Sequence, residues 1–255
     1  GDRTLISIGA DDATANAVNG NAAVGSGPSF QSPTGIAIRG DGKLVVTDGG
    51  ATTGVFSDAV FLVDPATGNR SILSDDTVPN TSNPLTTPNG IIVHSTQGIL
   101  VADSTTVDTV TKVDGATGAR TIFSSNTVPD GVNPISNPIG LVEDTNGTIL
   151  LVENNTTVGA NRQLLRLNAS TGARTVVSNM STTLAFSGVA AGPGGIFVTS
   201  TTTPDSLYQV NASTGAITLI SNSNVGDGVL LANNLNNGLV MIPGAAGAPE
   251  MNVKG

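Results

Sequence analysis

The stretch Pro33-Thr34-Gly35-Ile36-Ala37-Ile38 decides the fold, because related stretches return along the whole chain. Equivalent segments surround glycines at positions 90, 140, 188 and 228. From position 35 onward, the spacings between these glycines are 55, 50, 48 and 40 residues. A self-similar period of this length is typical of propellers and other repeat folds.

Each unit contains four short apolar runs separated by Gly- and Asn-rich turns, and none shows helical periodicity. In the first unit the runs are 36–38, 44–48, 60–63 and 70–74. Four strands in about 50 residues predict one four-stranded propeller blade. We place the blades at residues 35–74, 90–124, 140–178, 188–221 and 228–255, with 239–243 as the second strand of the last.

The last unit is incomplete, because residues 250–255 align with a third strand and no fourth strand follows. Residues 1–7 match residues 68–74 almost position for position. We therefore expect the N-terminal strand to close the last blade, which removes an exposed sheet edge. The residues that would make this closure are Arg3, Thr4, Leu5, Ile6, Met251 and Val253. The prediction is an all-β, single-domain propeller over residues 1–255 with five blades; six blades is the alternative.

The chain resembles the NHL-repeat and gluconolactonase-like propellers in the first unit, at Pro33–Ile38, Asp41–Asp48 and Val63–Gly68. The resemblance extends over essentially the whole chain. It implies a propeller fold, and its enzymes hold a divalent metal in the central funnel or use a His/Glu pair. The NHL sequence Gly-Asn-His-Arg is absent, since Ser104-Thr105-Thr106-Val107 stands in its place.

Composition narrows the range of partners. Ten Lys and Arg residues against 19 Asp and Glu residues give a net charge of -9, which disfavours nucleic acid. No apolar run is long enough to predict membrane insertion. The chain has no cysteine, which excludes disulfides and thiolate metal sites. Low charge with abundant Thr, Asn and Ser is typical of bacterial secreted and cell-surface proteins, the localisation we expect.

Acidic residues end the second strand of three consecutive blades, at Asp48, Asp103 and Glu153. These ends are expected to face one rim of the channel, where carboxylates and Asn154 or Asn155 would offer oxygen ligands to Ca²⁺. The alternative is that each carboxylate accepts backbone N–H groups locally, in its own turn.

Two further features have structural interpretations. Arginine recurs at one position of four outer strands, at residues 3, 70, 120 and 174. We interpret these arginines as pairing around turns with Asp64 and Asp114. His94 is the only histidine, so it cannot form a His pair, and we interpret it as structural.

Long loops are expected to gather on one face. The connections between second and third strands and between blades are long, and up-and-down topology places both kinds at the same face. Because function concentrates on such loops, we predict a non-catalytic structural or interaction module that binds a protein or a glycan there. One alternative is a metal-dependent lactonase- or lyase-like enzyme. Another is a head-to-tail homo-oligomer formed by exchange of residues 1–7.

Overall fold

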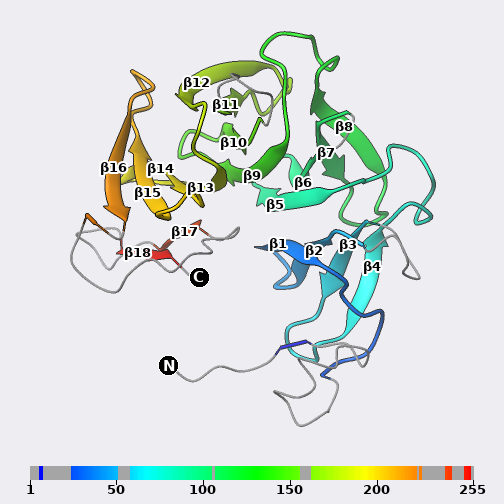
Figure 1. Cartoon of the computed structure of the whole chain (residues 1–255). Helices are drawn as coiled ribbons and strands as arrows, with labels where there is room; N and C mark the ends of the chain where they lie inside the picture. The colour runs from blue at the N-terminus through cyan, green and yellow to red at the C-terminus, as the bar shows by residue number, and fades with distance from the viewer. Residues whose placement is uncertain are drawn as a thin grey trace.

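The computed structural model describes residues 6–7, 24–50, 58–104, 107–155, 162–222, 224–225, 239–242 and 250–253, the last two ranges by backbone alone. Within these ranges the strands form four four-stranded antiparallel sheets and one two-stranded sheet. The four larger sheets stand around a common centre as blades (Figure 1), which we number 1 to 4 in chain order. The predicted all-β propeller architecture is therefore confirmed. No helix in this described part is long and apolar enough to span a membrane.

Each blade is a meander in which consecutive strands pair. Blade 1 contains β1 (Pro33–Ile38), β2 (Leu44–Asp48), β3 (Ala59–Val63) and β4 (Arg70–Ser74). Blade 2 contains β5 (Pro88–His94), β6 (Gly98–Asp103), β7 (Thr109–Val113) and β8 (Arg120–Ser125). Blade 3 contains β9 (Pro138–Glu143), β10 (Ile149–Glu153), β11 (Arg162–Leu167) and β12 (Arg174–Ser181). Blade 4 contains β13 (Phe186–Gly192), β14 (Gly195–Ser200), β15 (Ser206–Val210) and β16 (Ile217–Asn222).

The structure shows four complete blades in the described residues, where the sequence predicted five, with six as the alternative. The remaining sheet pairs β17 (Leu239–Ile242) with β18 (Glu250–Val253), and we call it the closing sheet. The first strands of neighbouring blades lie beside one another, and β17 lies beside β13 in the same way. β17 therefore holds a first-strand position, so the prediction that 239–243 is a second strand was wrong.

Apolar clusters fill the spaces between consecutive blades. The cluster between blades 1 and 2 includes Val45 and Leu73 from one side and Ile91 and Val101 from the other. Two equivalent clusters join blades 2 to 3 and 3 to 4. Because a middle blade is covered on both faces, a strand such as β10 is buried at every position, as its unbroken apolar run predicts.

The face of blade 1 that points away from blade 2 has a cluster of its own. Val46, Ala59, Phe61 and Val63 form it, and Phe30 meets Phe61 edge-on with ring centroids 5.1 Å apart. No opposing blade contributes a residue to this cluster among those the structure describes. This cluster therefore corresponds to the part that a single blade contributes to the apolar clusters between consecutive blades.

The predicted closure of the ring by residues 1–7 falls mostly outside the described residues. Arg3, Thr4 and Leu5 are not among them, and the side chains of Met251 and Val253 are not described. Ile6 is described and lies at blade 1.

Candidate functional site

The second strands of blades 1 to 3 end in buried carboxylates, as predicted, and each carboxylate binds a backbone segment of its own blade. Asp48 ends β2 and is 1 % exposed. Its two oxygens accept hydrogen bonds from the amides of Gln31 and Ser32, each at 2.8 Å. The carboxylate thus fixes the loop that leads into β1, 16 to 17 residues before it in the chain.

The same arrangement recurs in the next two blades. The amides of Thr86 and Thr87 donate to Asp103, the latter at 2.8 Å, and the amide of Ser136 donates to Glu153 at 2.9 Å. Both acidic side chains are almost fully buried. The partner amides precede the first strand, so they do not belong to the turn that follows the carboxylate. The structure supports a local backbone role, although in a different segment from the one the sequence suggested.

Burial perturbs these carboxyl groups. It raises the pKa of Glu153 to about 7, aided by the charge of Asp108 and opposed by the amide hydrogen bond. Burial also raises the pKa of Asp58 to about 6, with the negative charges of Asp103 and Asp76 adding to the effect. Neighbouring carboxylates therefore repel one another at the edge where the second strands end. A bound anion would be electrostatically unfavourable there.

The predicted calcium ligands are not brought together as a metal site. They are Asp48, Asp103, Glu153 and Asn154. Asn154 accepts a hydrogen bond from Nε of Arg162, and its backbone binds Asn137. Over the ranges that the structure describes, no group of three or more His, Asp or Glu side chains could hold a metal ion. Each predicted ligand has a partner within its own blade instead.

In blade 4, uncharged hydroxyl groups connect the end of the second strand to the segment before the first strand. Ser200 ends β14 and is fully buried, and its hydroxyl accepts the amide of Thr202. The Thr202 hydroxyl then accepts the amide of Ala185, which precedes β13, at 2.7 Å. A carboxylate is therefore not required at this position for the blade to form.

The recurring arginines anchor the loops between blades. Arg120 begins β8 and is 4 % exposed. Its guanidinium donates to the carbonyl oxygens of Asn83 at 2.7 Å and Asn80 at 2.6 Å, and to the hydroxyl of Ser74 at 2.7 Å. The carbonyl of Val78 accepts a further bond at 3.1 Å. One buried side chain thus holds the whole 75–83 loop, which joins blade 1 to blade 2.

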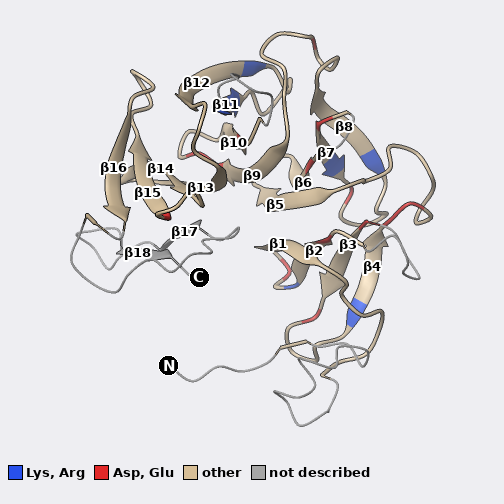
Figure 2. Ribbon diagram, in the orientation of Figure 1, with Lys and Arg blue, Asp and Glu red and all other residues tan. Residues whose placement is uncertain are grey.

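Arg174 repeats this geometry for the loop between blades 2 and 3. Its guanidinium binds the carbonyls of Asn133 at 2.7 Å and Asp130 at 2.6 Å. Figure 2 shows basic residues, in blue, on the outer strands β4, β8 and β12, which begin at Arg70, Arg120 and Arg174. The predicted pairing with turn aspartates was wrong: Asp64 and Asp114 accept backbone amides within their own turns.

His94 connects two blades from a buried position. Its Nε2 lies 3.1 Å from the Gly147 carbonyl oxygen, and its Nδ1 accepts the amides of Thr96 and Gln97. Glu143 is 3.8 Å from Nε2. The ring is 2 % exposed, so its role is structural, in agreement with the sequence interpretation.

The long interblade loops enter at the edge where the second strands end, because the strands alternate in direction. The described loops 75–87 and 126–137 expose apolar side chains on this long-loop face. Val78, Val128 and Val132 are 39 %, 38 % and 60 % exposed. Among the residues that the structure describes, aromatic side chains contribute little to this face, since Phe186 is buried against Tyr208 and Phe30 packs on Phe61.

Neither a family model nor a curated protein matches the chain. The resemblance to NHL-repeat and gluconolactonase-like propellers therefore stays a prediction.

Solved structures match at the level of the fold. An oxidoreductase described as a glucose dehydrogenase from Thermus thermophilus aligns with 13 % identity and a TM-score of 0.52, covering 74 % of this chain and 64 % of that one. The extracellular domain of a one-component system from Bacteroides thetaiotaomicron aligns with 15 % identity and a TM-score of 0.54, covering 89 % of this chain and 26 % of that one.

The PQQ-bound aldose sugar dehydrogenase from Streptomyces coelicolor aligns with 14 % identity and a TM-score of 0.51, covering 91 % of this chain and 84 % of that one. The chain spans less than two thirds of the length of the other two proteins. At these identities the likeness shows a propeller fold and carries no activity over.

Proposed function

We propose that this propeller is a non-catalytic interaction module of a secreted or cell-surface protein, which binds a protein partner through its long-loop face. Support for the localisation comes from the low charge of the chain and from its likeness to an extracellular domain. We also propose, independently of this function, that the last unit forms a fifth blade with residues 1–7, and that β17 is the first strand of that blade.

The observation that carries the proposal is the repeated loop anchored by arginine. Loops 75–87 and 126–137 share a Val-Pro step, at residues 78–79 and 128–129, and each is held by one guanidinium. A loop fixed before binding loses little conformational entropy when a partner docks, so affinity per contact is higher. Rigid backbone with exposed valines is thus suited to a binding surface.

The exposed side chains favour a protein over a glycan. Sugar-binding surfaces use aromatic rings for stacking. Of the described aromatic residues near the loops, Phe186 is buried and Phe30 is half-buried with its ring edge-on to Phe61, so neither is free on the long-loop face. Val78, Val128 and Val132 instead offer small apolar contacts of the kind found at the centre of protein interfaces.

An enzymatic role has less support. The metal-dependent lactonase or lyase alternative requires free ligands, whereas the strand-end carboxylates are occupied by backbone amides. The PQQ of the aldose sugar dehydrogenase is a tricarboxylate quinone, and it does not fit here. The strand-end rim presents carboxylates, and the buried Arg120 and Arg174 are occupied by loop carbonyls.

Substitution of the loop valines tests the proposal. We would probe an array of extracellular proteins and glycans with three labelled forms: the unchanged chain, the double variant Val128→Glu/Val132→Glu, and Ala66→Glu. Ala66 is exposed in a β3–β4 turn at the opposite edge, so it is the matched control. Protein hits shared by the unchanged chain and Ala66→Glu but lost in the double variant support the proposal.

Three results would contradict it: hits that survive the double variant, hits confined to glycans, or hydrolysis of lactone substrates that a chelator abolishes. The last result would restore the enzyme alternative.

A further inference from the structure

The contact between consecutive blades follows one pattern. A turn glycine of each blade lies against the fourth strand of the blade before it. A Cβ added at Gly118 would lie 1.8 Å from the Leu73 carbonyl oxygen, and one added at Gly172 would lie 2.2 Å from that of Phe123. The following serine, Ser124, donates from its hydroxyl to the Gly172 carbonyl at 2.8 Å.

Arginine completes the pattern from the same direction. Nη1 of Arg120 donates to the Ser74 hydroxyl, and Nη1 of Arg174 donates to the Ser124 hydroxyl, both at 2.7 Å. Blades 2 and 3 thus recognise the end of the preceding fourth strand by glycine, serine and arginine together. Blade 4 uses glycine and serine alone, because Ile217 stands at the position of the arginine. We call this set of contacts the strand seat.

Ile6 and Ser7 occupy the strand seat of blade 1. A Cβ added at Gly68 would lie 2.3 Å from the Ile6 carbonyl oxygen, and the Ser7 hydroxyl donates to the Gly68 carbonyl at 2.7 Å. Arg70 donates from Nη1 to the Ser7 hydroxyl. The N-terminal residues therefore lie on blade 1 as a fourth strand of a preceding blade would.

The inner part of the same face is uncovered. Ile36 of β1 is 63 % exposed, whereas its equivalents Ile91, Leu141 and Val189 in blades 2 to 4 are 6 %, 7 % and 5 % exposed. Ile38 is 70 % exposed. β1 therefore lacks the cover that the first strands of the other three blades have.

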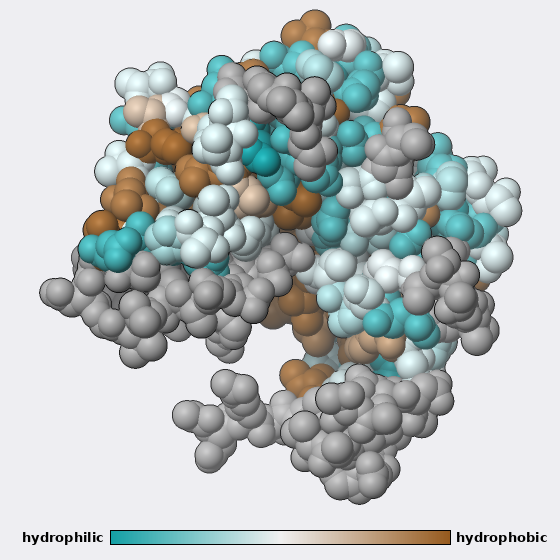
Figure 3. Space-filling view, in the orientation of Figure 1, coloured by the Kyte–Doolittle hydropathy of each residue, from teal (hydrophilic) through white to brown (hydrophobic). Residues whose placement is uncertain are grey.

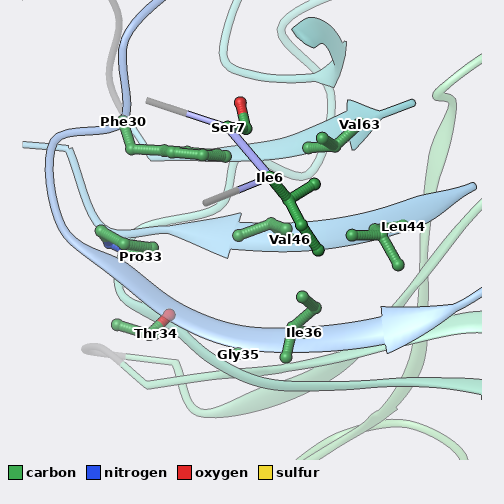
Figure 4. A pocket seen from close by; sticks show the side chains of 10 residues that line it. All are labelled: Ile6, Ser7, Phe30, Pro33, Thr34, Gly35, Ile36, Leu44, Val46 and Val63. Atoms are coloured by element: carbon green, nitrogen blue, oxygen red, sulfur yellow. The ribbon is translucent and has the colours of Figure 1, made fainter. Parts of the chain in front are cut away.

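A hollow of about 420 Å³ separates Ile6 from β1 and is lined by apolar side chains, including Ile36, Leu44, Val46 and Val63 (Figure 4). Figure 3 shows brown apolar atoms in the gap on this side of the molecule. This face of blade 1 therefore resembles the apolar surface that the other blades bury against a neighbour, but no neighbouring sheet among the described residues covers it.

We propose that the uncovered face of blade 1 is the docking site for the closing sheet, β17–β18, of the same chain, with Ile6–Ser7 in its outer-strand position. The closing sheet is already held against blade 4, since β17 lies beside β13 as a next first strand. The outer-strand position is filled by the same chain. Because both parts are tethered to one molecule, their effective concentration favours closure over capture of a second copy. This closure of the ring does not depend on whether the long-loop face binds a partner.

Single cysteines test closure, because the chain has no cysteine of its own. We would measure the maleimide reaction rate of Ile36→Cys and Ile38→Cys in the full chain. The controls are Ile91→Cys, the buried equivalent in blade 2, and Val132→Cys, which is 60 % exposed. Light scattering would give the mass of each variant, and far-UV circular dichroism would confirm that each one folds.

If the ring is closed, the thiol at 36 reacts at least about tenfold more slowly than the thiol at 132, because it reacts only when the contact opens. The thiol at 38 slows less, because its equivalents Val93, Glu143 and Ala191 are only half-buried in the covered blades. Protection in a species of 25.3 kDa supports the proposal. Reaction as fast as at 132 overturns closure. Protection only in a larger species, lost on dilution, overturns closure within one chain and makes a second copy the occupant.

Discussion

Replacement of Arg120 by methionine measures what one buried guanidinium contributes to the fold. Methionine keeps much of the side-chain length and apolar stem but removes every donor. The bonds lost include three at 2.6 to 2.7 Å, to Asn80, Asn83 and Ser74, and a longer one to Val78 at 3.1 Å. Hydrogen bonds to a charged group contribute about 1.5 to 3 kcal/mol each.

Two effects make the loss of unfolding free energy smaller than the sum of these hydrogen-bond contributions. The freed carbonyls of an exposed loop can bind water, and a buried methionine gains about 1.5 kcal/mol or more of apolar transfer energy. We therefore expect Arg120→Met to lower the free energy of unfolding by about 3 kcal/mol, a large part of the roughly 5 to 15 kcal/mol typical of a domain. Limited proteolysis should also cut the 75–83 loop sooner.

Urea unfolding followed by circular dichroism measures the change, with Arg166→Met as the matched control. Arg166 pairs with Asp144 at 2.5 Å within blade 3 and anchors no interblade loop, so its loss should cost about 1 to 2 kcal/mol, less than the loss of Arg120. Equal losses in the two variants, or a loss below about 1 kcal/mol for Arg120→Met, would refute the assignment of Arg120 as the loop anchor.

Further predictions concern the strand-end carboxyls and the turn glycines. The folded pKa of Glu153, about 7, lies above its ordinary value of 4.5, so its contribution to stability is full below pH 4.5 and is lost as pH rises through 7. Between pH 5 and pH 8 the unchanged chain should therefore lose up to about 3 kcal/mol of unfolding free energy relative to Glu153→Gln in urea titrations; parallel pH profiles would contradict this. Asp48→Asn leaves one amide without its acceptor and should cost about 1 to 3 kcal/mol in a urea titration, whereas no loss would show that the carboxylate does not hold the loop. Gly118→Ala places a Cβ 1.8 Å from the Leu73 carbonyl oxygen, while Gly147→Ala, at nearly the same φ, meets nothing within 4 Å. Thermal unfolding should show a loss of about 1 to 2 kcal/mol for the Gly147 variant and a clearly larger loss for the Gly118 variant, and similar losses would argue against the close blade contact.

The repeat was sufficient to predict the first four blades, although not the fifth, because apolar runs and turn glycines are properties of the local sequence. β2 and β10 have the predicted bounds, and the four second strands end at the predicted residues. The error in the last unit has a local cause. Asp227-Gly228-Val229 resembles the marker stretch, but it also resembles Asp130-Gly131-Val132 in an interblade loop. If Gly238 is taken as the marker glycine instead, it lies 50 residues after Gly188, and the strand that follows it is a first strand, as β17 is.

The candidate site shows where local patterns stop being informative. The sequence identified the recurring carboxylates and arginines but not their partners, since both bind backbone atoms, and backbone atoms leave no signature in side-chain identity. Asp48 reaches back 16 to 17 residues, and Arg120 binds a loop 37 or more residues away. The recurring charges favoured the hypothesis that arginine pairs with aspartate, but the guanidinium groups of Arg120 and Arg174 bind loop carbonyl oxygens instead.

Blade 4 reveals that a loop and its arginine form one exchangeable cassette. Ile217 stands where Arg174 stands in blade 3, and the connection before blade 4 has only residues 182–185. A long connection without a guanidinium would leave carbonyls unanchored, and a guanidinium without a long connection would be buried with no acceptors. Engineering of this propeller should therefore transplant or delete the two together: a shortened 75–87 segment calls for isoleucine at position 120.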